Sequence, residues 1–183
     1  MKIYEITRYA ISELSPDAQA KALDKVREGE QENFPQDLLS EAMDEQASYL
    51  LAGNYEAKQS ELKLYYSLSY SQGDGVAMHG TIYPADAPNL TLPANTYRVN
   101  IKHEGRYYHE YSFSVELLDE DYEEIEDEDD KVLKQLRDIC KQLERFGYKW
   151  DKDYFSDKNM QELAENMGEV FTSSGLISDP VRS

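Results

Sequence analysis

The sequence predicts an α+β fold in which a four-stranded antiparallel meander sheet is combined with two N-terminal and two C-terminal helices. Three observations support this prediction. Apolar residues recur at a helical period across residues 16–52 and again after residue 130. Between residues 62 and 117 the period changes to two, which is typical of strands with one buried face. Glycine-containing turns separate the alternating segments, as in consecutive hairpins.

The first elements are a strand and two helices. Residues 2–10 contain apolar, aromatic and threonine residues that favour a strand. This strand could be a fifth member of the sheet. Ser15 and Pro16 then provide an N-cap and a favourable first helical position, and we expect this helix to stop near Gly29. A second helix is predicted over residues 35–52.

The middle of the chain contains the strands. In the first of them leucine and tyrosine alternate with lysine, serine and tyrosine, and the turn Gln72-Gly73-Asp74-Gly75 follows. A proline-rich loop covers residues 84–93, and Glu104-Gly105 joins the last two strands. The four strands are predicted at residues 62–71, 76–82, 96–103 and 106–117.

Two helices are predicted after the sheet. The third has its apolar stripe between Val132 and Phe146 and is expected to end at Gly147, and the fourth opens at Ser156 with a stripe that reaches Phe171. From Thr172 onward the pattern is that of a frayed end. The predicted organisation is therefore an α+β core over residues 1–118, an acidic segment over 119–130, a helical pair over 131–173 that packs on the core, and a frayed tail over 174–183.

The charge of the chain is its most informative property. The 183 residues include 37 Asp and Glu against 19 Lys and Arg, for a net charge of -18. Such a field repels nucleic acids and anionic membranes and attracts basic surfaces. Ten carboxylates are concentrated in the segment 119–130, and we expect them to bind a partner: Asp119, Glu120, Asp121, Glu123, Glu124, Glu126, Asp127, Glu128, Asp129 and Asp130.

The spacing of these carboxylates permits two interpretations. As a helix with ~1.5 Å rise per residue, the segment would carry one charge per ~1.8 Å, close to the ~1.7 Å of duplex DNA. As an extended chain its spacing of about 4 Å is near the ~3.4 Å of one strand, so either form could mimic a polyanion. The alternative is a solvated linker whose carboxylates favour the N-terminus of the next helix. A calcium loop is disfavoured because the EF-hand pattern is missing.

Weaker contact candidates lie among the strands and their turns. Asp74 is at a loop tip, and Tyr65, Tyr70 and Tyr108 offer large amphipathic rings for a protein partner. Tyrosines can also stack on nucleic-acid bases, but the net charge disfavours this because the sequence shows no basic groove.

The residues suggest no catalytic site, metal site or cofactor. His79, His103 and His109 lack zinc-site spacing, and Cys140 lies in an apolar stripe as expected of a buried thiol. Residues 1–5 do not begin a signal peptide, and no apolar stretch has the length of a membrane span, so we expect a cytoplasmic protein that does not enter a membrane.

Two motifs resemble a group of small, mostly uncharacterised phage and mobile-element proteins. Residues 13–22 match its ELSxxAxxKA opening, and residues 66–75 match its YSLSYSQGDG segment. Some members are labelled antitoxin-like. Acidic proteins of this origin resemble inhibitors of host defence, including anti-CRISPR and anti-restriction proteins, which often occupy a nucleic-acid-binding surface.

The resemblance implies a phage or mobile-element origin and carries over no established activity or catalytic residues. By analogy with such inhibitors, we expect a non-enzymatic inhibitor in the host cytoplasm. It would bind a basic, nucleic-acid-handling defence protein, for example a CRISPR effector, without contacting nucleic acid directly. An antitoxin-like or regulatory module that binds one protein through apolar contacts is the alternative. An enzyme that uses His79, His103 or His109 in an unrecognised pocket is a third hypothesis.

Overall fold

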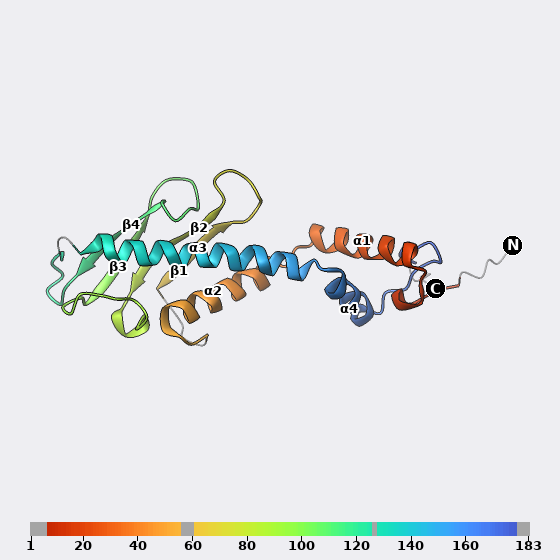
Figure 1. Ribbon diagram of the computed structural model, residues 1–183, viewed down its shortest axis with the longest axis horizontal. Coiled ribbons are helices and arrows are strands. Elements are labelled where there is room, and N and C mark those ends of the chain that lie inside the picture. The colour runs from red at the N-terminus through yellow and green to blue at the C-terminus, as the bar shows by residue number, and fades with distance from the viewer. Residues whose placement is uncertain (1–6, 56–60, 126–127, 179–183) are drawn as a thin grey trace. The chain divides into compact units, whose positions relative to one another are not determined.

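The computed structural model describes residues 7–55, 61–125 and 128–178, which form an α+β structure (Figure 1). Its chain divides into two compact units: a terminal unit, Met1–Gln36 with Trp150–Ser183, and a central unit, Asp37–Lys149. The boundaries expected at residues 118, 130 and 173 do not coincide with this division. The reason is that the chain after residue 118 pairs back onto the sheet, and most of the third helix belongs to the central unit.

The terminal unit is built on two α-helices, α1 (Pro16–Glu32) and α4 (Asp157–Met167), with the short 3₁₀ helix η1 (Ile11–Glu13). Pro16 occupies the first position of α1 as predicted, although the helix continues beyond Gly29 to Glu32. Apolar side chains from these three elements and from Phe171 form one core, made of Ile11, Ala22, Leu23, Val26, Met160, Ala164 and Phe171.

Phe171 joins the first and the last described segments of the chain. Of the strand predicted over residues 2–10, positions 2–6 lie outside the described residues, and Tyr9 forms a single antiparallel bridge with Phe171. Gly168 ends α4 in a left-handed conformation, so the apolar stripe expected to continue to Phe171 leaves the helix. Phe171 also bridges Ile177, so the described part of the expected frayed tail is a tight hairpin.

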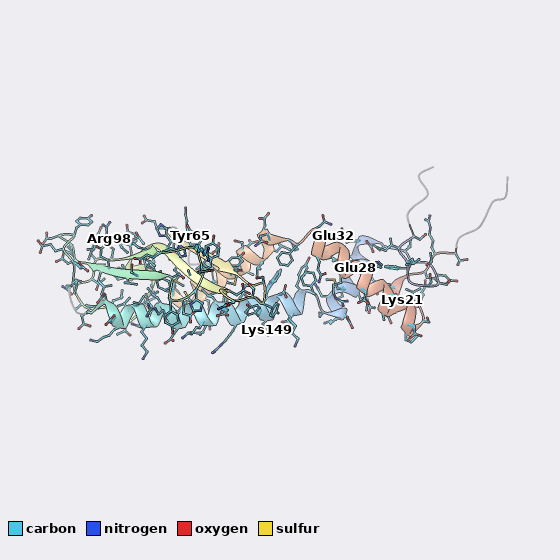
Figure 2. All side chains as sticks on the ribbon, turned by 90° about the horizontal axis from the view of Figure 1, so that it is seen from above. Lys21, Glu28, Glu32, Tyr65, Arg98 and Lys149 are labelled. Carbon is cyan, nitrogen blue, oxygen red and sulfur yellow. The ribbon has the colours of Figure 1, made fainter. Side chains whose placement is uncertain are left out.

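The central unit contains the predicted meander. The strands are β1 (Leu62–Ser67), β2 (Gly75–Ile82), β3 (Arg98–His103) and β4 (Phe113–Leu118), all antiparallel and in the order β1-β2-β3-β4. The helix α2 (Gln36–Ala52) precedes them, the 3₁₀ helix η2 (Pro84–Asp86) follows β2, and α3 (Asp129–Tyr154) comes last. Figures 1 and 2 show α3 running along one face of the sheet.

One face of the sheet is apolar and the other is polar. The buried face includes Val76, Met78, Ile82, Val99, Ile101, Phe113, Val115 and Leu117, and α3 contributes Val132, Leu136, Ile139 and Leu143 to the same core. On the opposite face, Asn100 donates a hydrogen bond to Glu116 (3.1 Å) and Lys102 pairs with the same carboxylate (3.2 Å). This division explains the period-two pattern of the sequence.

Two predicted strands are longer than the observed ones. β1 ends at Ser67 because the following serines turn toward the Asp74 carboxylate instead of continuing the ladder. β4 begins only at Phe113, since residues 104–112 form a long loop in place of the tight Glu104-Gly105 turn. Both differences lie at the same end of the sheet.

Gly147 does not end α3, contrary to expectation. The helix continues to Tyr154, and Gly147 lies buried within it. A Cβ at this position would collide with the Leu68 side chain and lie 3.3 Å from the Met43 sulfur. The glycine therefore allows α3 to approach the end of β1 and α2 closely, which is a packing role that sequence alone cannot separate from helix termination.

We predict that Gly80→Ala destabilises the protein by about 3 kcal/mol or more. Gly80 has a φ of 125°, and an added Cβ would overlap the backbone carbonyl of Glu61, which has no freedom to rotate away. The matched control is Gly105→Ala, where φ is also positive (86°) but no atom lies within 4 Å. That variant should lose only about 1 kcal/mol. Urea unfolding of both variants measures the difference, and equal losses would contradict the steric argument.

Candidate functional site

The first half of the acidic segment is a tight turn that folds back onto β4. Asp119 Oδ1 accepts hydrogen bonds from the backbone N–H groups of Asp121 and Glu123, both at 2.9 Å. Glu124 then bridges Leu118. This part of the segment is therefore neither the helix nor the extended strand that the charge-spacing argument assumed.

The second half of the segment belongs to the start of α3. Asp129 and Asp130 occupy the first turn of the helix, where carboxylates interact favourably with the helix dipole. Glu128 pairs with Lys131 at 2.7 Å. Glu126 and Asp127 lie outside the described residues. The ten carboxylates thus divide between a turn and a helix start, and they do not form one uniformly spaced polyanion.

A surface pocket of about 630 Å³ lies against the acidic turn. We call it the acidic pocket. Its lining combines the acidic turn, η2 and the turn before β3: Tyr83, Pro84, Ala85, Ala94, Asn95, Thr96, Tyr97, Asp119, Glu120 and Asp121. Three carboxylates and two phenol rings therefore face one cavity.

Aromatic contacts order the rim of the acidic pocket. Tyr97 makes edge contacts with Tyr83 and with Tyr122, at ring-centroid distances of 6.2 and 5.7 Å. Tyr122 has a φ of 63°, an unusual conformation for a bulky residue, and the Arg98 guanidinium lies 4.7 Å from its ring centroid. The tyrosines next to the pocket thus already hold one guanidinium. Carboxylates beside aromatic rings suit a further cation, such as a lysine or arginine side chain of a partner.

A second cluster lies at the opposite end of the strands, where the β1–β2 turn meets the β3–β4 loop (Figure 1). Its centre is Asp74. Oδ1 of Asp74 accepts hydrogen bonds from the hydroxyls of Ser67 (2.8 Å), Ser69 (2.9 Å) and Ser71 (3.1 Å). Oδ2 accepts from the Ser71 backbone N–H at 2.8 Å and from the Tyr148 hydroxyl at 3.1 Å. Five donors from one turn and from α3 therefore converge on a single carboxylate.

The hydrogen bonds determine the charge state of this cluster. Desolvation opposes ionisation of Asp74, but the donors from Ser71, Ser67 and Ser69 outweigh it and hold the pKa of Asp74 well below its usual range. Burial and the bond to Asp74 raise the pKa of Tyr148 to about 12, so its phenol stays protonated and donates. Asp74 is the loop-tip residue that the sequence singled out, and the structure assigns it a role in closing the turn.

The three tyrosines proposed as partner contacts lie at this end of the sheet, away from the acidic pocket. Tyr65 stacks on Tyr108 with ring centroids 5.5 Å apart. Tyr70 is 72% exposed, has a φ of 57°, and contacts the Tyr148 ring at 4.6 Å. The structure therefore separates the predicted aromatic contacts from the predicted acidic ones.

No sequence pattern singles out Glu110, which is only 6% exposed. Its carboxylate lies 3.0 Å from His109 Nδ1 and 3.7 Å from Lys141 Nζ, and its backbone carbonyl accepts a hydrogen bond from Arg137 Nε at 3.1 Å. The sequence did contain one signal for this contact. Arg137 and Lys141 are one helical turn apart on α3, so both can reach the same neighbouring residue. This ion-pair network fixes the β3–β4 loop on α3.

A pocket of about 480 Å³ lies between the two loops at this end. It is lined by Gln72, Gly73, Tyr107, His109 and Ser112 and is called the loop pocket below. His109 is thus the one histidine of the three that lines this cavity, whereas His79 Nδ1 lies 3.4 Å from the backbone nitrogen of His103. Glu110 is not among the lining residues, but its carboxylate holds the His109 ring from behind through Nδ1.

Cys140 is buried on α3, and burial together with the nearby Glu110 carboxylate raises the pKa of its thiol. A thiol with a raised pKa is a poor nucleophile at neutral pH. Within the three described stretches, no group of three His, Cys, Asp or Glu side chains is placed to hold a metal ion.

The fold and the two pockets define an acidic α+β protein with an anionic cavity at one end of its sheet and an aromatic, hydrogen-bonding cavity at the other. Comparisons of the chain with protein-family models, with curated proteins and with solved structures found no match. None of the helices in the described residues is long and apolar enough to cross a bilayer.

We predict that Asp74→Asn lowers the free energy of unfolding by about 1–2 kcal/mol at pH 7, because hydrogen bonds to an ionised acceptor are lost. The folded-state pKa of Asp74 is depressed, so its stabilising contribution is complete above the ordinary pKa and disappears as the pH falls through the folded-state value. The difference in the free energy of unfolding between wild type and variant, measured by urea unfolding, should therefore decrease from pH 7 to pH 3. Tyr148→Phe removes a single donor and should have a smaller effect, and a gap that does not change with pH would contradict the assignment.

Proposed function

We propose that this protein is a non-enzymatic inhibitor, of phage or mobile-element origin, that binds a basic nucleic-acid-handling defence protein of the host. A CRISPR effector is the partner class we favour. The observation that carries the proposal is the acidic pocket, in which Asp119, Glu120 and Asp121 share a cavity with Tyr83 and Tyr97.

The geometry of the acidic pocket supports recognition of a basic side chain. Asp119 is committed to the backbone of its own turn, which leaves Glu120 and Asp121 as exposed carboxylates. A lysine or arginine that enters between them and the Tyr97 ring gains charge-assisted hydrogen bonds and a cation–π contact. Tyrosine and arginine are also the residues that most often dominate binding energy at protein interfaces.

The wider charge distribution supports the same partner class. The helix α2 has Asp37, Glu41, Asp44 and Glu45 and no lysine or arginine. With a net charge of -18, the chain attracts a basic protein over distances beyond direct contact. Steering of this kind raises the association rate, and salt weakens it.

One observation favours the alternative of an antitoxin-like or regulatory module. The terminal unit exposes three large apolar side chains, Met167 (61%), Leu176 (54%) and Ile177 (43%). Binding through these residues would be insensitive to salt and would leave the acidic pocket dispensable.

We predict that the purified protein inhibits target cleavage by at least one member of a panel of CRISPR effectors and restriction enzymes. Inhibition should weaken between about 50 and 500 mM salt because the contact is electrostatic. The double variant Glu120→Gln with Asp121→Asn should bind that effector about tenfold more weakly, which corresponds to the loss of about 1.4 kcal/mol. Asp119 is left unchanged because it holds the turn.

The matched control is Glu41→Gln with Glu45→Gln, which removes the same charge from exposed positions on α2. Its affinity should change less than twofold. Equal losses of affinity in the two double variants would show that binding depends only on net charge and not on the acidic pocket. A pocket variant that binds and inhibits like the wild type would refute the acidic pocket, and loss of binding in Leu176→Ser would then support the apolar alternative.

A further inference from the structure

The exposed face of α3 has a regular stripe of cations inside this acidic chain. The residues recur at intervals of three or four positions: Lys134, Arg137, Lys141, Arg145 and Lys149. At 3.6 residues per turn they fall within about 120° of arc, on the side opposite the buried Val132, Leu136 and Leu143. The stripe is about 22 Å long. Asp138 lies within this arc, Glu144 borders it beside Arg145, and Glu110 pairs with Lys141 at 3.7 Å, so five cations minus three anions leave a local charge of +2.

Aromatic side chains connect this stripe to the loop pocket. Arg137 and Lys141 lie over the Tyr111 ring, at 4.8 and 5.7 Å from its centroid. Tyr111 in turn stacks on His109, with ring centroids 5.2 Å apart. Because His109 lines the loop pocket, cations, an exposed ring and the cavity are contiguous.

The loop pocket has the chemistry of a nucleobase site. Tyr107 is half exposed and packs against Gly73, and the exposed Arg106 guanidinium lies 4.7 Å from its ring centroid, so a base stacks on this ring in the place of Arg106. Gln72, His109 and Ser112 offer an amide, an imidazole and a hydroxyl that can donate to or accept from the edge of a base. Proteins that bind single strands combine these two elements, stacking rings for the bases and a basic track for the backbone.

We infer that the α3 stripe and the loop pocket together bind a single-stranded nucleic acid, with phosphates on the cations and one base in the pocket. A duplex fits less well because its paired bases cannot enter the pocket or stack on Tyr107. An acidic polypeptide would satisfy the cations but would leave the rings and the pocket without a matching group.

The net charge of -18 weakens this binding without abolishing it. Exposed charges more than ~8 Å apart are largely screened at physiological salt, so the local +2 determines the potential at the stripe. The inference departs from the expectation of no direct nucleic-acid contact, which rested on the absence of a basic groove in the sequence. It does not depend on the proposed function, although a strand held by the same effector would be a suitable ligand.

Fluorescence anisotropy with labelled single-stranded RNA and DNA of about 12 nucleotides, titrated between about 20 and 200 mM salt, tests the inference. The triple variant Lys134→Gln, Arg145→Gln, Lys149→Gln changes only exposed side chains. It should reduce the slope of log K against log salt by about 2, because each phosphate contact on a single strand contributes about 0.7. Tyr107→Ala should weaken binding about tenfold and leave the slope unchanged, since it removes stacking only.

The matched control is Lys21→Gln, Lys25→Gln, Lys158→Gln, which removes three exposed cations from α1 and α4. It should bind as the wild type does, and so should the acidic-pocket double variant. The inference is overturned if the wild type fails to bind either oligonucleotide at about 20 mM salt, if the control loses as much slope as the stripe variant, or if polyglutamate competes as well as the unlabelled strand. Circular dichroism of each variant confirms that the fold is retained, and Tyr107→Phe, which keeps the ring, should restore binding.

Discussion

The central unit depends on the packing of α3 against the sheet. Its apolar stripe closes the core, and its polar residues then fix three separate loops. Gln135 accepts a hydrogen bond from the Thr91 backbone nitrogen (2.8 Å) and donates one to the Thr91 carbonyl (3.1 Å), which attaches the proline-rich loop. Arg137 holds the β3–β4 loop through the Glu110 carbonyl, and Tyr148 holds the β1–β2 turn through Asp74. Side chains on one helix thus position the surfaces on which both proposals rest.

Charge in this protein is segregated by place rather than spread evenly. Carboxylates gather at the acidic turn and on α2, whereas cations line the outer face of α3. Because salt screens each surface from the other, the protein presents opposite potentials at different places on its surface. The net charge does not indicate the cationic surface, since it sums the acidic and the basic regions.

Local patterns predicted most of the fold. The proline and serine signals located the start of α1, and the change of period located a four-stranded meander whose order is confirmed. Predictions were wrong where long-range contacts decided the outcome. Gly147 is typical of a helix end in the sequence. In the structure its missing side chain makes room for Leu68, which is distant in the sequence. The alternating serines after Ser67 read as a strand, yet the Asp74 carboxylate recruits them into a turn.

The candidate sites show the same limit. Composition pointed to residues 119–130, but no local rule says that Asp119 closes a turn or that Tyr83 and Tyr97 share its cavity. Glu110 could not be identified from the sequence. It is buried by the long β3–β4 loop, where we predicted only a tight Glu104-Gly105 turn. The cation stripe, by contrast, was readable from its spacing of three and four, once the helix was known to continue past Gly147.

The five donors that meet at Asp74 also have a consequence for motion. Because one carboxylate is the shared acceptor, the bonds from Ser67, Ser69, Ser71 and Tyr148 cannot be broken independently without leaving the anion poorly solvated. The turn should therefore open in a single cooperative step, and the hydrogen-bonded amide protons of Ser71 and Asp74 should exchange with solvent at a common rate. Gln72 and Gly73 of this turn line the loop pocket, so that side of the pocket should stay rigid until the whole turn opens.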